Sequence, residues 1–67
     1  MKKLFDFLKS YNGSRVVNIY FELNNNSYCV ENCVFNITHL PCYYYLQNFY
    51  VNDFDDCYDY IDVWLIK

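Results

Sequence analysis

A stretch of alternating side chains, from Arg15 to Leu23, most constrains the fold of this 67-residue chain. Apolar residues at every second position are typical of a strand that buries one face. One face would carry Val17, Ile19, Phe21 and Leu23, and the other Val16, Asn18, Tyr20 and Glu22. The polar run Asn24 to Ser27 follows, and it favours a tight turn because Asn tolerates left-handed backbone conformations. These features predict a β-hairpin.

Two further strands are predicted downstream of that turn. Tyr28 to Ile37 would form the returning strand, with a bulge or kink at Glu31-Asn32, where the apolar positions change parity. Tyr43 to Val51 is rich in Tyr and Phe, which favour strands over helices. Asn52 to Asp56 would then turn the chain.

The N-terminal residues Met1 to Tyr11 predict a short amphipathic helix. Asn12-Gly13 would end this helix, with glycine as a left-handed cap. The expected apolar side of the helix consists of Leu4, Phe5, Leu8 and Tyr11.

The C-terminal stretch Asp53 to Lys67, DFDDCYDYIDVWLIK, fits two patterns. As a strand from Tyr60 onward, it would bury one set of alternating residues and expose the other. As a helix over residues 53–65, it would place a stripe of apolar residues opposite its Asp residues. Asp, Tyr, Ile, Val and Trp are mediocre to poor helix formers, so the strand is favoured, with a possible helical turn at Asp53 to Cys57. The strand would point Ile61, Val63 and Leu65 inward and Tyr60, Asp62 and Trp64 outward.

These segments predict one α+β domain spanning residues 1–67, with a short N-terminal helix packed on a four-stranded antiparallel sheet (αββββ). The alternative, with residues 53–65 helical, is αβββα. A chain this short buries a small fraction of its surface, but 24% of the residues are aromatic, and each buried ring removes a large area from water. A folded domain is therefore expected.

Charge is strongly segregated along the chain. No Lys or Arg occurs between Val16 and Ile66, a span that carries seven of the eight acidic residues. Four of the five bases precede this span. A one-signed field speeds encounter with a cationic partner and repels phosphate, so we expect a basic protein partner and no direct binding of nucleic acid.

Carboxylates and rings gather in the C-terminal stretch. Alternate side chains on one face of a strand stand roughly 6.6 Å apart, so such a row offers a basic groove an array of acceptors that imitates a nucleic-acid backbone. Tyr and Trp would add the apolar anchoring that dominates interface energetics. The expected partner-binding residues are Asp53, Asp55, Asp56, Asp59, Asp62, Tyr58, Tyr60 and Trp64.

Catalysis and cofactor binding have little support. The pair His39 and Cys42 lacks a third orienting group, and a single Gly excludes a phosphate-binding glycine loop. We expect no enzyme activity and no cofactor. The weak alternative is a zinc module built from the four cysteines, but two thiols four residues apart on one strand would stand roughly 13 Å apart. Its ligands would be Cys29, Cys33, Cys42 and Cys57.

No secretory signal is recognised, because Asp6 and Lys9 interrupt the first apolar run. No run approaches the roughly 18 apolar residues needed to cross a bilayer. A cytoplasmic location in the bacterial host with reduced thiols, and no membrane partner, is therefore expected.

The chain opens MKKLF, is rich in Asn, Tyr, Phe and Asp, and ends its base-free span in DFDDCYDYIDVW. In these features it resembles the small acidic anti-defence proteins of phages, the anti-CRISPR-like inhibitors. The resemblance is compositional and covers the whole chain, so it transfers no individual functional positions. It implies a stoichiometric inhibitor that occupies the nucleic-acid groove, or another surface, of a bacterial immune enzyme. The alternative is a homodimer without an inhibitory role, paired through the exposed rings Tyr20, Tyr43 to Tyr45 and Trp64.

Overall fold

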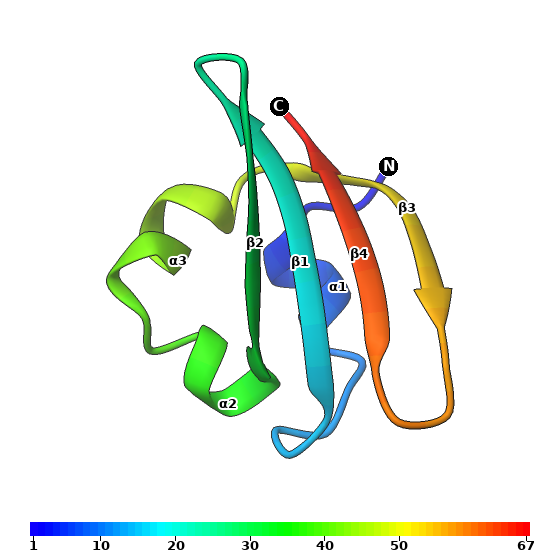
Figure 1. Ribbon diagram of the computed structural model, residues 1–67. Coiled ribbons are helices and arrows are strands. Elements are labelled where there is room, and N and C mark those ends of the chain that lie inside the picture. The colour runs from blue at the N-terminus through cyan, green and yellow to red at the C-terminus, as the bar shows by residue number, and fades with distance from the viewer.

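The computed structural model describes residues 1–67 and shows an α+β fold with one four-stranded sheet (Figure 1). The predicted N-terminal helix and four-stranded sheet are present, together with two further short helices, but the third strand is formed by other residues than predicted. In chain order the elements are α1 (Leu4–Leu8), β1 (Val16–Leu23), β2 (Asn26–Cys33), α2 (Val34–Ile37), α3 (Pro41–Leu46), β3 (Tyr50–Asp56) and β4 (Ile61–Ile66).

The sheet is mixed, with the strand order β2-β1-β4-β3. Two antiparallel hairpins, β1–β2 and β3–β4, lie side by side, and their inner strands β1 and β4 run parallel. The purely antiparallel sheet predicted from sequence is therefore wrong. Parallel neighbours need a long connection. Here α2 and α3 provide it between the two hairpins.

The first hairpin turns at Asn24 and Asn25, whose φ angles are 52° and 67°. Two successive positive φ values are typical of the turn that matches the twist of a tight hairpin. The pairing from Leu23↔Asn26 to Val16↔Cys33 is continuous, so the bulge predicted at Glu31-Asn32 is absent. The apolar positions change parity because β2 ends at Cys33 and α2 begins at Val34. The buried residues of α2, Val34 and Ile37, have the spacing of a helix.

The third predicted strand, Tyr43 to Val51, is also wrong, because α3 occupies its first half. Pro41 starts this helix in the position where the missing N–H costs nothing, and Tyr43 and Leu46 form its buried side. The strand β3 instead includes Asn52 to Asp56, which the sequence suggested as a turn. Pairing with β4 overrides the weak strand preference of Asp and Asn, and the edge position leaves their side chains in water.

The C-terminal segment is a strand, which confirms the favoured interpretation and rules out the αβββα arrangement. Ile61 and Val63 are fully buried, while Trp64 on the other face is exposed. Asp53 to Cys57 forms no helical turn, because Asp53 to Asp56 belongs to β3. A register shift between Val51 and Asp53 leaves Asn52 as the extra residue of a bulge in β3.

The N-terminal helix is shorter than predicted and turns a slightly different side to the core. Leu4, Phe7 and Leu8 are buried, whereas Phe5, expected on the apolar side, is 43% exposed. Gly13 has a negative φ, so the left-handed cap predicted there is absent. Gly13 instead lies close to the start of α2, since its carbonyl accepts the Phe35 amide over 2.8 Å.

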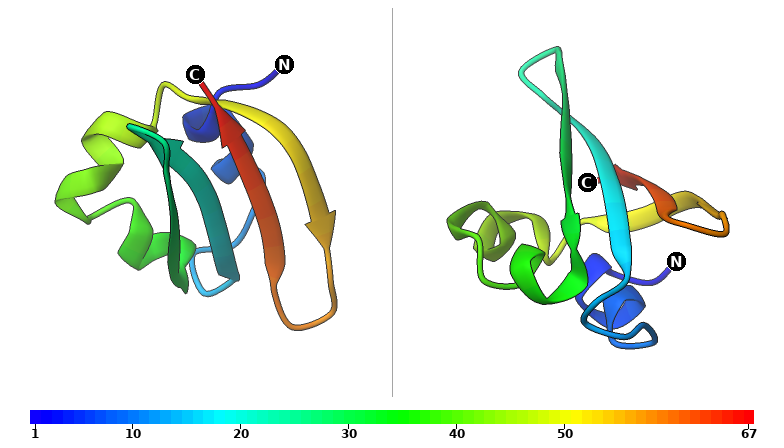
Figure 2. Two further views of the ribbon diagram at one scale, coloured as in Figure 1. Left: turned by 45° about the horizontal axis from the view of Figure 1, so that its top comes forward. Right: turned by 60° about the horizontal axis from the view of Figure 1, so that its bottom comes forward.

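The hydrophobic core lies against one face of the sheet. Its fully buried members are Leu4, Val17, Ile19, Ile61 and Val63. Helix α1 packs behind β1 and β4, and α2 and α3 flank β2 (Figures 1 and 2). No helix lies across the front of the sheet as drawn in Figure 1, so this face is open.

Candidate partner-binding face

The open face of the sheet carries five carboxylates, and we call it the acidic face. Strand alternation and register place one residue from each strand in a row across it: Glu31, Asn18, Asp62 and Asp55. The next row is Cys29, Tyr20, Trp64 and Asp53. Since adjacent strands lie about 4.8 Å apart, neighbours in a row are close. The acidic face is defined by Glu22, Glu31, Asp53, Asp55 and Asp62.

Two of these carboxylates, Asp55 and Asp62, lie directly opposite each other on β3 and β4. Side chains in that relation have Cβ atoms about 4.5–5.5 Å apart, and like charges there destabilise a sheet. Asp62 is partly compensated, because its Oδ1 accepts a hydrogen bond from Asn18 Nδ2 over 3.0 Å. The Tyr20 hydroxyl donates to the same oxygen over 3.3 Å. Asp55 has no hydrogen-bonding or ion-pair partner and is exposed.

Asn18 is the one buried polar residue of the protein, at 9% exposure, and it lies in the middle of the acidic face. Its Nδ2 is used by Asp62, but its Oδ1 has no hydrogen-bond partner. A buried acceptor without a donor costs free energy. An acceptor at this position therefore lacks a donor in the isolated chain.

Two aromatic rings stand beside this row of carboxylates. Tyr20 and Trp64 are register partners on β1 and β4, and their rings stack with centroids 5.4 Å apart and planes 15° from parallel. Burial raises the pKa of the Tyr20 hydroxyl, and the neighbouring Asp62 charge raises it further. Trp64 remains 39% exposed. The rings form an apolar platform within a strongly acidic surface.

Arg15 holds the loop between β3 and β4. Its guanidinium donates to Asp56 Oδ1 over 2.5 Å, to the Tyr58 carbonyl over 2.7 Å, and also to the Cys57 carbonyl. Asp56 pairs in register with the inward-facing Ile61, so it lies on the helix side of the sheet. Its charge is thus neutralised away from the acidic face. The tip of the loop holds Asp59 and Tyr58, the latter 95% exposed.

The eight residues expected to bind a partner are therefore not all brought together. Asp53, Asp55, Asp62 and Trp64 lie on the acidic face. Tyr58, Asp59 and Tyr60 lie in the adjoining loop, where a hydrogen bond with the Cys57 side chain raises the pKa of Tyr60. Asp56 is separated from them. The structure adds four residues that sequence reasoning did not assign to the site: Asn18, Tyr20, Glu22 and Glu31. Alternation of β1 indicated that Asn18, Tyr20 and Glu22 share a face, but only the pairing with β4 brings them beside Asp62.

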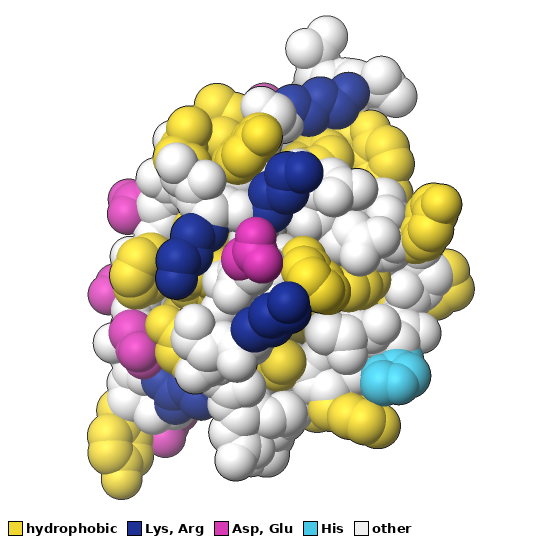
Figure 3. Space-filling view, turned by 180° about the vertical axis from the view of Figure 1, so that it is seen from behind, with side chains coloured by type: hydrophobic (Ala, Val, Ile, Leu, Met, Phe, Trp, Pro, Cys, Tyr) yellow, Lys and Arg dark blue, Asp and Glu magenta, His cyan; other side chains and the backbone are white.

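Basic residues lie on the other side of the molecule. Figure 3, viewed from behind the sheet of Figure 1, shows Lys and Arg side chains spread over this face, with most of the visible Asp and Glu near one edge. The strands supply no base to the acidic face, because Val16 to Ile66 contains none. The charge segregation seen along the chain thus becomes a segregation between two faces.

The cysteines do not form a metal centre. No group of three or more His, Cys, Asp or Glu side chains is arranged to hold a metal ion. Cys29 and Cys33 lie on the acidic side of β2, Cys42 is on α3, and Cys57 is in the loop after β3. His39 is occupied locally, with its Nδ1 2.7 Å from the Phe35 carbonyl oxygen.

The rings expected in a homodimer seam are divided among different elements. Tyr20 and Trp64 lie on the acidic face, whereas Tyr44 and Tyr45 are exposed on α3. Tyr43 is buried in the core. These rings do not form one continuous apolar strip.

The fold and this face define a small α+β protein with a helix-covered core and an open, acidic, ring-bearing sheet. No protein-family model, curated protein or solved structure matches the chain. Its helices are all too short to cross a lipid bilayer.

Proposed function

We propose that this chain is a small non-enzymatic binding protein that covers a basic, nucleic-acid-binding groove of a partner protein with its acidic face. In line with the resemblance of its sequence, the partner would be a bacterial immune enzyme and the protein an inhibitor from a phage or mobile element. The observation that carries the proposal is the collection of five carboxylates without a base on the one face that no helix covers.

The arrangement on this face costs stability, which favours a role beyond solubility. Asp55 and Asp62 repel each other across two strands, and Asn18 Oδ1 is buried without a donor. A solvated surface needs neither feature. A cationic partner would relieve the repulsion, and an arriving donor would satisfy a buried acceptor.

The proposed mode of action is mimicry. Carboxylate oxygens spaced across a twisted sheet present acceptors to Lys and Arg side chains that otherwise bind phosphates. The Tyr20–Trp64 pair would add apolar contact near the centre. Long-range attraction would speed association, and salt would weaken it.

The test uses purified bacterial immune nucleases and measures cleavage of their nucleic-acid substrates in the presence of the protein. We expect stoichiometric inhibition of at least one nuclease, with affinity falling as salt is raised. Asp53→Lys combined with Asp55→Lys should weaken inhibition by more than about tenfold, because both residues are exposed on the acidic face.

The matched control compares single substitutions with equal changes in net charge. Asp55→Lys alters the acidic face, whereas Asp6→Lys alters α1 behind the sheet. Asp6→Lys should leave inhibition nearly unchanged. Equal losses in the two variants would show that net charge, and not this face, determines binding. Absence of inhibition across nucleases with basic grooves would contradict the proposed function itself.

A further inference from the structure

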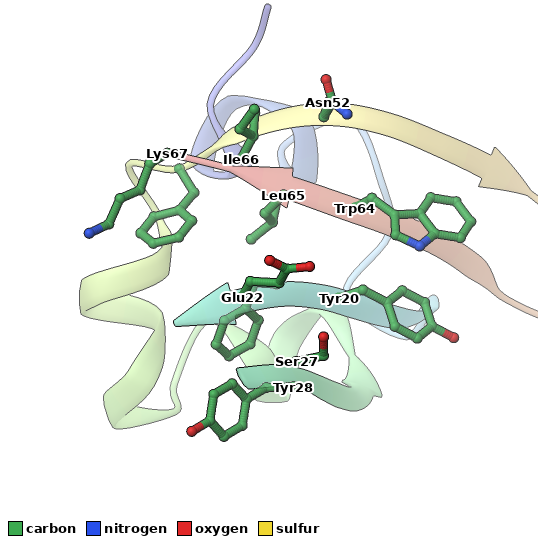
Figure 4. Close-up of a pocket in the computed structure, with 11 residues that line it drawn as sticks. Tyr20, Glu22, Ser27, Tyr28, Asn52, Trp64, Leu65, Ile66 and Lys67 are labelled. Atoms are coloured by element: carbon green, nitrogen blue, oxygen red, sulfur yellow. The ribbon is translucent and has the colours of Figure 1, made fainter. Parts of the chain in front are cut away.

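The sheet splits at one end of the acidic face. The strands β1 and β4 pair from Val17↔Ile61 to Tyr20↔Trp64 and then diverge, although β1 continues to Leu23 and β4 to Ile66. A hollow of about 550 Å³ opens between the diverging ends (Figure 4). It lies directly beside the stacked rings.

The hollow has a mostly apolar lining with one carboxylate, that of Glu22, and one base, Lys67. Phe21, Phe49 and Leu65 supply apolar surface from the edge of the core. Figure 4 shows the Glu22 carboxylate reaching from β1 across the gap toward Leu65 of β4. Glu22 has no hydrogen-bond or ion-pair partner within the chain. Its negative charge is therefore available to a ligand.

The stacked rings close one end of the hollow. Tyr20 and Trp64 lie together at that end in Figure 4, and Lys67 lies at the other with its amine directed away. Tyr20 is two residues before Glu22, a separation of roughly 6.6 Å along a strand. A cationic group at that end of the hollow can therefore lie beside the Tyr20–Trp64 pair and meet the Glu22 carboxylate.

We propose that this hollow receives an arginine side chain of the partner, an inference that rests on the proposed function and names its anchoring contact. The aliphatic stem of arginine would lie on Phe21, Phe49 and Leu65, as long basic side chains do on apolar surface. The guanidinium would donate to Glu22 and lie beside the Tyr20–Trp64 pair. Arginine fits better than lysine because its planar group can form paired hydrogen bonds with one carboxylate.

Other ligand classes fit less well. An anion would be repelled by Glu22 and by the remaining carboxylates of the acidic face. A purely apolar group would remove water from Glu22 without giving it a partner, which is costly. A cation with an apolar stem satisfies both parts of the lining.

The probe is an octa-arginine peptide, and the readouts are calorimetric affinity and the fluorescence of Trp64, the single Trp of the chain. Glu22→Gln and Glu31→Gln remove the same charge from the acidic face, but only Glu22 lines the hollow. We expect Glu22→Gln to weaken binding roughly tenfold or more, since it removes a charge-assisted hydrogen bond, and Glu31→Gln to weaken it much less. Wild-type binding should change Trp64 fluorescence, and octa-lysine should bind more weakly.

Equal losses in the two glutamate variants, or binding that leaves Trp64 fluorescence unchanged, would overturn the inference. Trp64→Leu gives a second measure by calorimetry, and it should weaken octa-arginine more than octa-lysine. The inference and the proposed function fail differently. If Asp53→Lys with Asp55→Lys weakens nuclease inhibition but Glu22→Gln and Trp64→Leu do not, the acidic face binds the partner and the hollow is not the anchoring contact. If none of these substitutions weakens inhibition, both proposals are wrong.

Discussion

The guanidinium of Arg15 lies 2.5 Å from Asp56 Oδ1, although the two residues are 41 positions apart in the chain. The same group binds the carbonyl oxygens of Cys57 and Tyr58. Arg15 thus connects the start of β1 to the loop that joins β3 and β4. This contact holds the second hairpin in place next to the first, and it removes Asp56 from the set of free carboxylates.

Arg15→Gln should lower the free energy of unfolding by about 1–2 kcal/mol, because the loop carbonyls lose a charged donor. Asp56→Asn removes only the ion pair, and the Asp56 side chain is 48% exposed, so its cost should stay below about 1 kcal/mol. Urea denaturation monitored by circular dichroism measures both values. An equal cost for the two variants would mean that the carbonyl contacts contribute nothing.

Asn25→Gly should stabilise the protein modestly, because Asn25 has a φ of 67° and glycine adopts this conformation without strain. Asn25→Ala should lower the free energy of unfolding by about 1 kcal/mol for the opposite reason. Asn48→Ala, at an exposed position with ordinary φ, serves as the control and should change little. Thermal unfolding of the three variants compares them, and a stabilising Asn25→Ala would contradict the turn geometry.

Stability should decrease in alkaline solution, because four tyrosines have pKa values raised above the ordinary 10.0. Burial is the main cause for Tyr11, Tyr20 and Tyr43, and a hydrogen bond with Cys57 is the main cause for Tyr60. Between the unfolded and folded pKa values, the folded chain keeps protons that the unfolded chain has lost. The free energy of unfolding is therefore unaffected by these groups below about pH 9 and falls as pH rises past about 10.

Denaturation curves across this alkaline range measure the decline. Tyr43→Phe should make it shallower, because that ring is buried and phenylalanine does not titrate. Tyr58→Phe, at a ring that is 95% exposed, should leave the decline unchanged. A free energy of unfolding that increases above about pH 10 would contradict this prediction.

Ile61→Val should cost about 0.5–1.5 kcal/mol, because Ile61 is fully buried where β4 meets the core and its lost methylene leaves a void. The same change at Ile66, which is 45% exposed on the same strand, should cost less than about 0.5 kcal/mol. Urea denaturation distinguishes the two. A larger loss at Ile66 would place the core on the wrong side of β4.

Local patterns in the sequence were sufficient for β1, for the Asn turn and for β4. In each case the alternation or the backbone tolerance of a few adjacent residues determines the local structure. The same patterns failed for residues 43–56, where α3 replaces a predicted strand and β3 replaces a predicted turn. Asp53 to Asp56 has weak intrinsic strand preference, so its conformation depends on the partner strand β4.

The amino-acid sequence by itself determined that charge is segregated and which side of β1 and β4 is apolar. Only the tertiary structure decided that these two strands lie parallel and adjacent, which places Tyr20 on Trp64 and Asn18 on Asp62. The physical reason is that the residues of a strand determine which of its faces is apolar. Which strand pairs beside it depends on the long connection through α2 and α3. The acidic face and its hollow form because β1 and β4 are neighbours in the sheet.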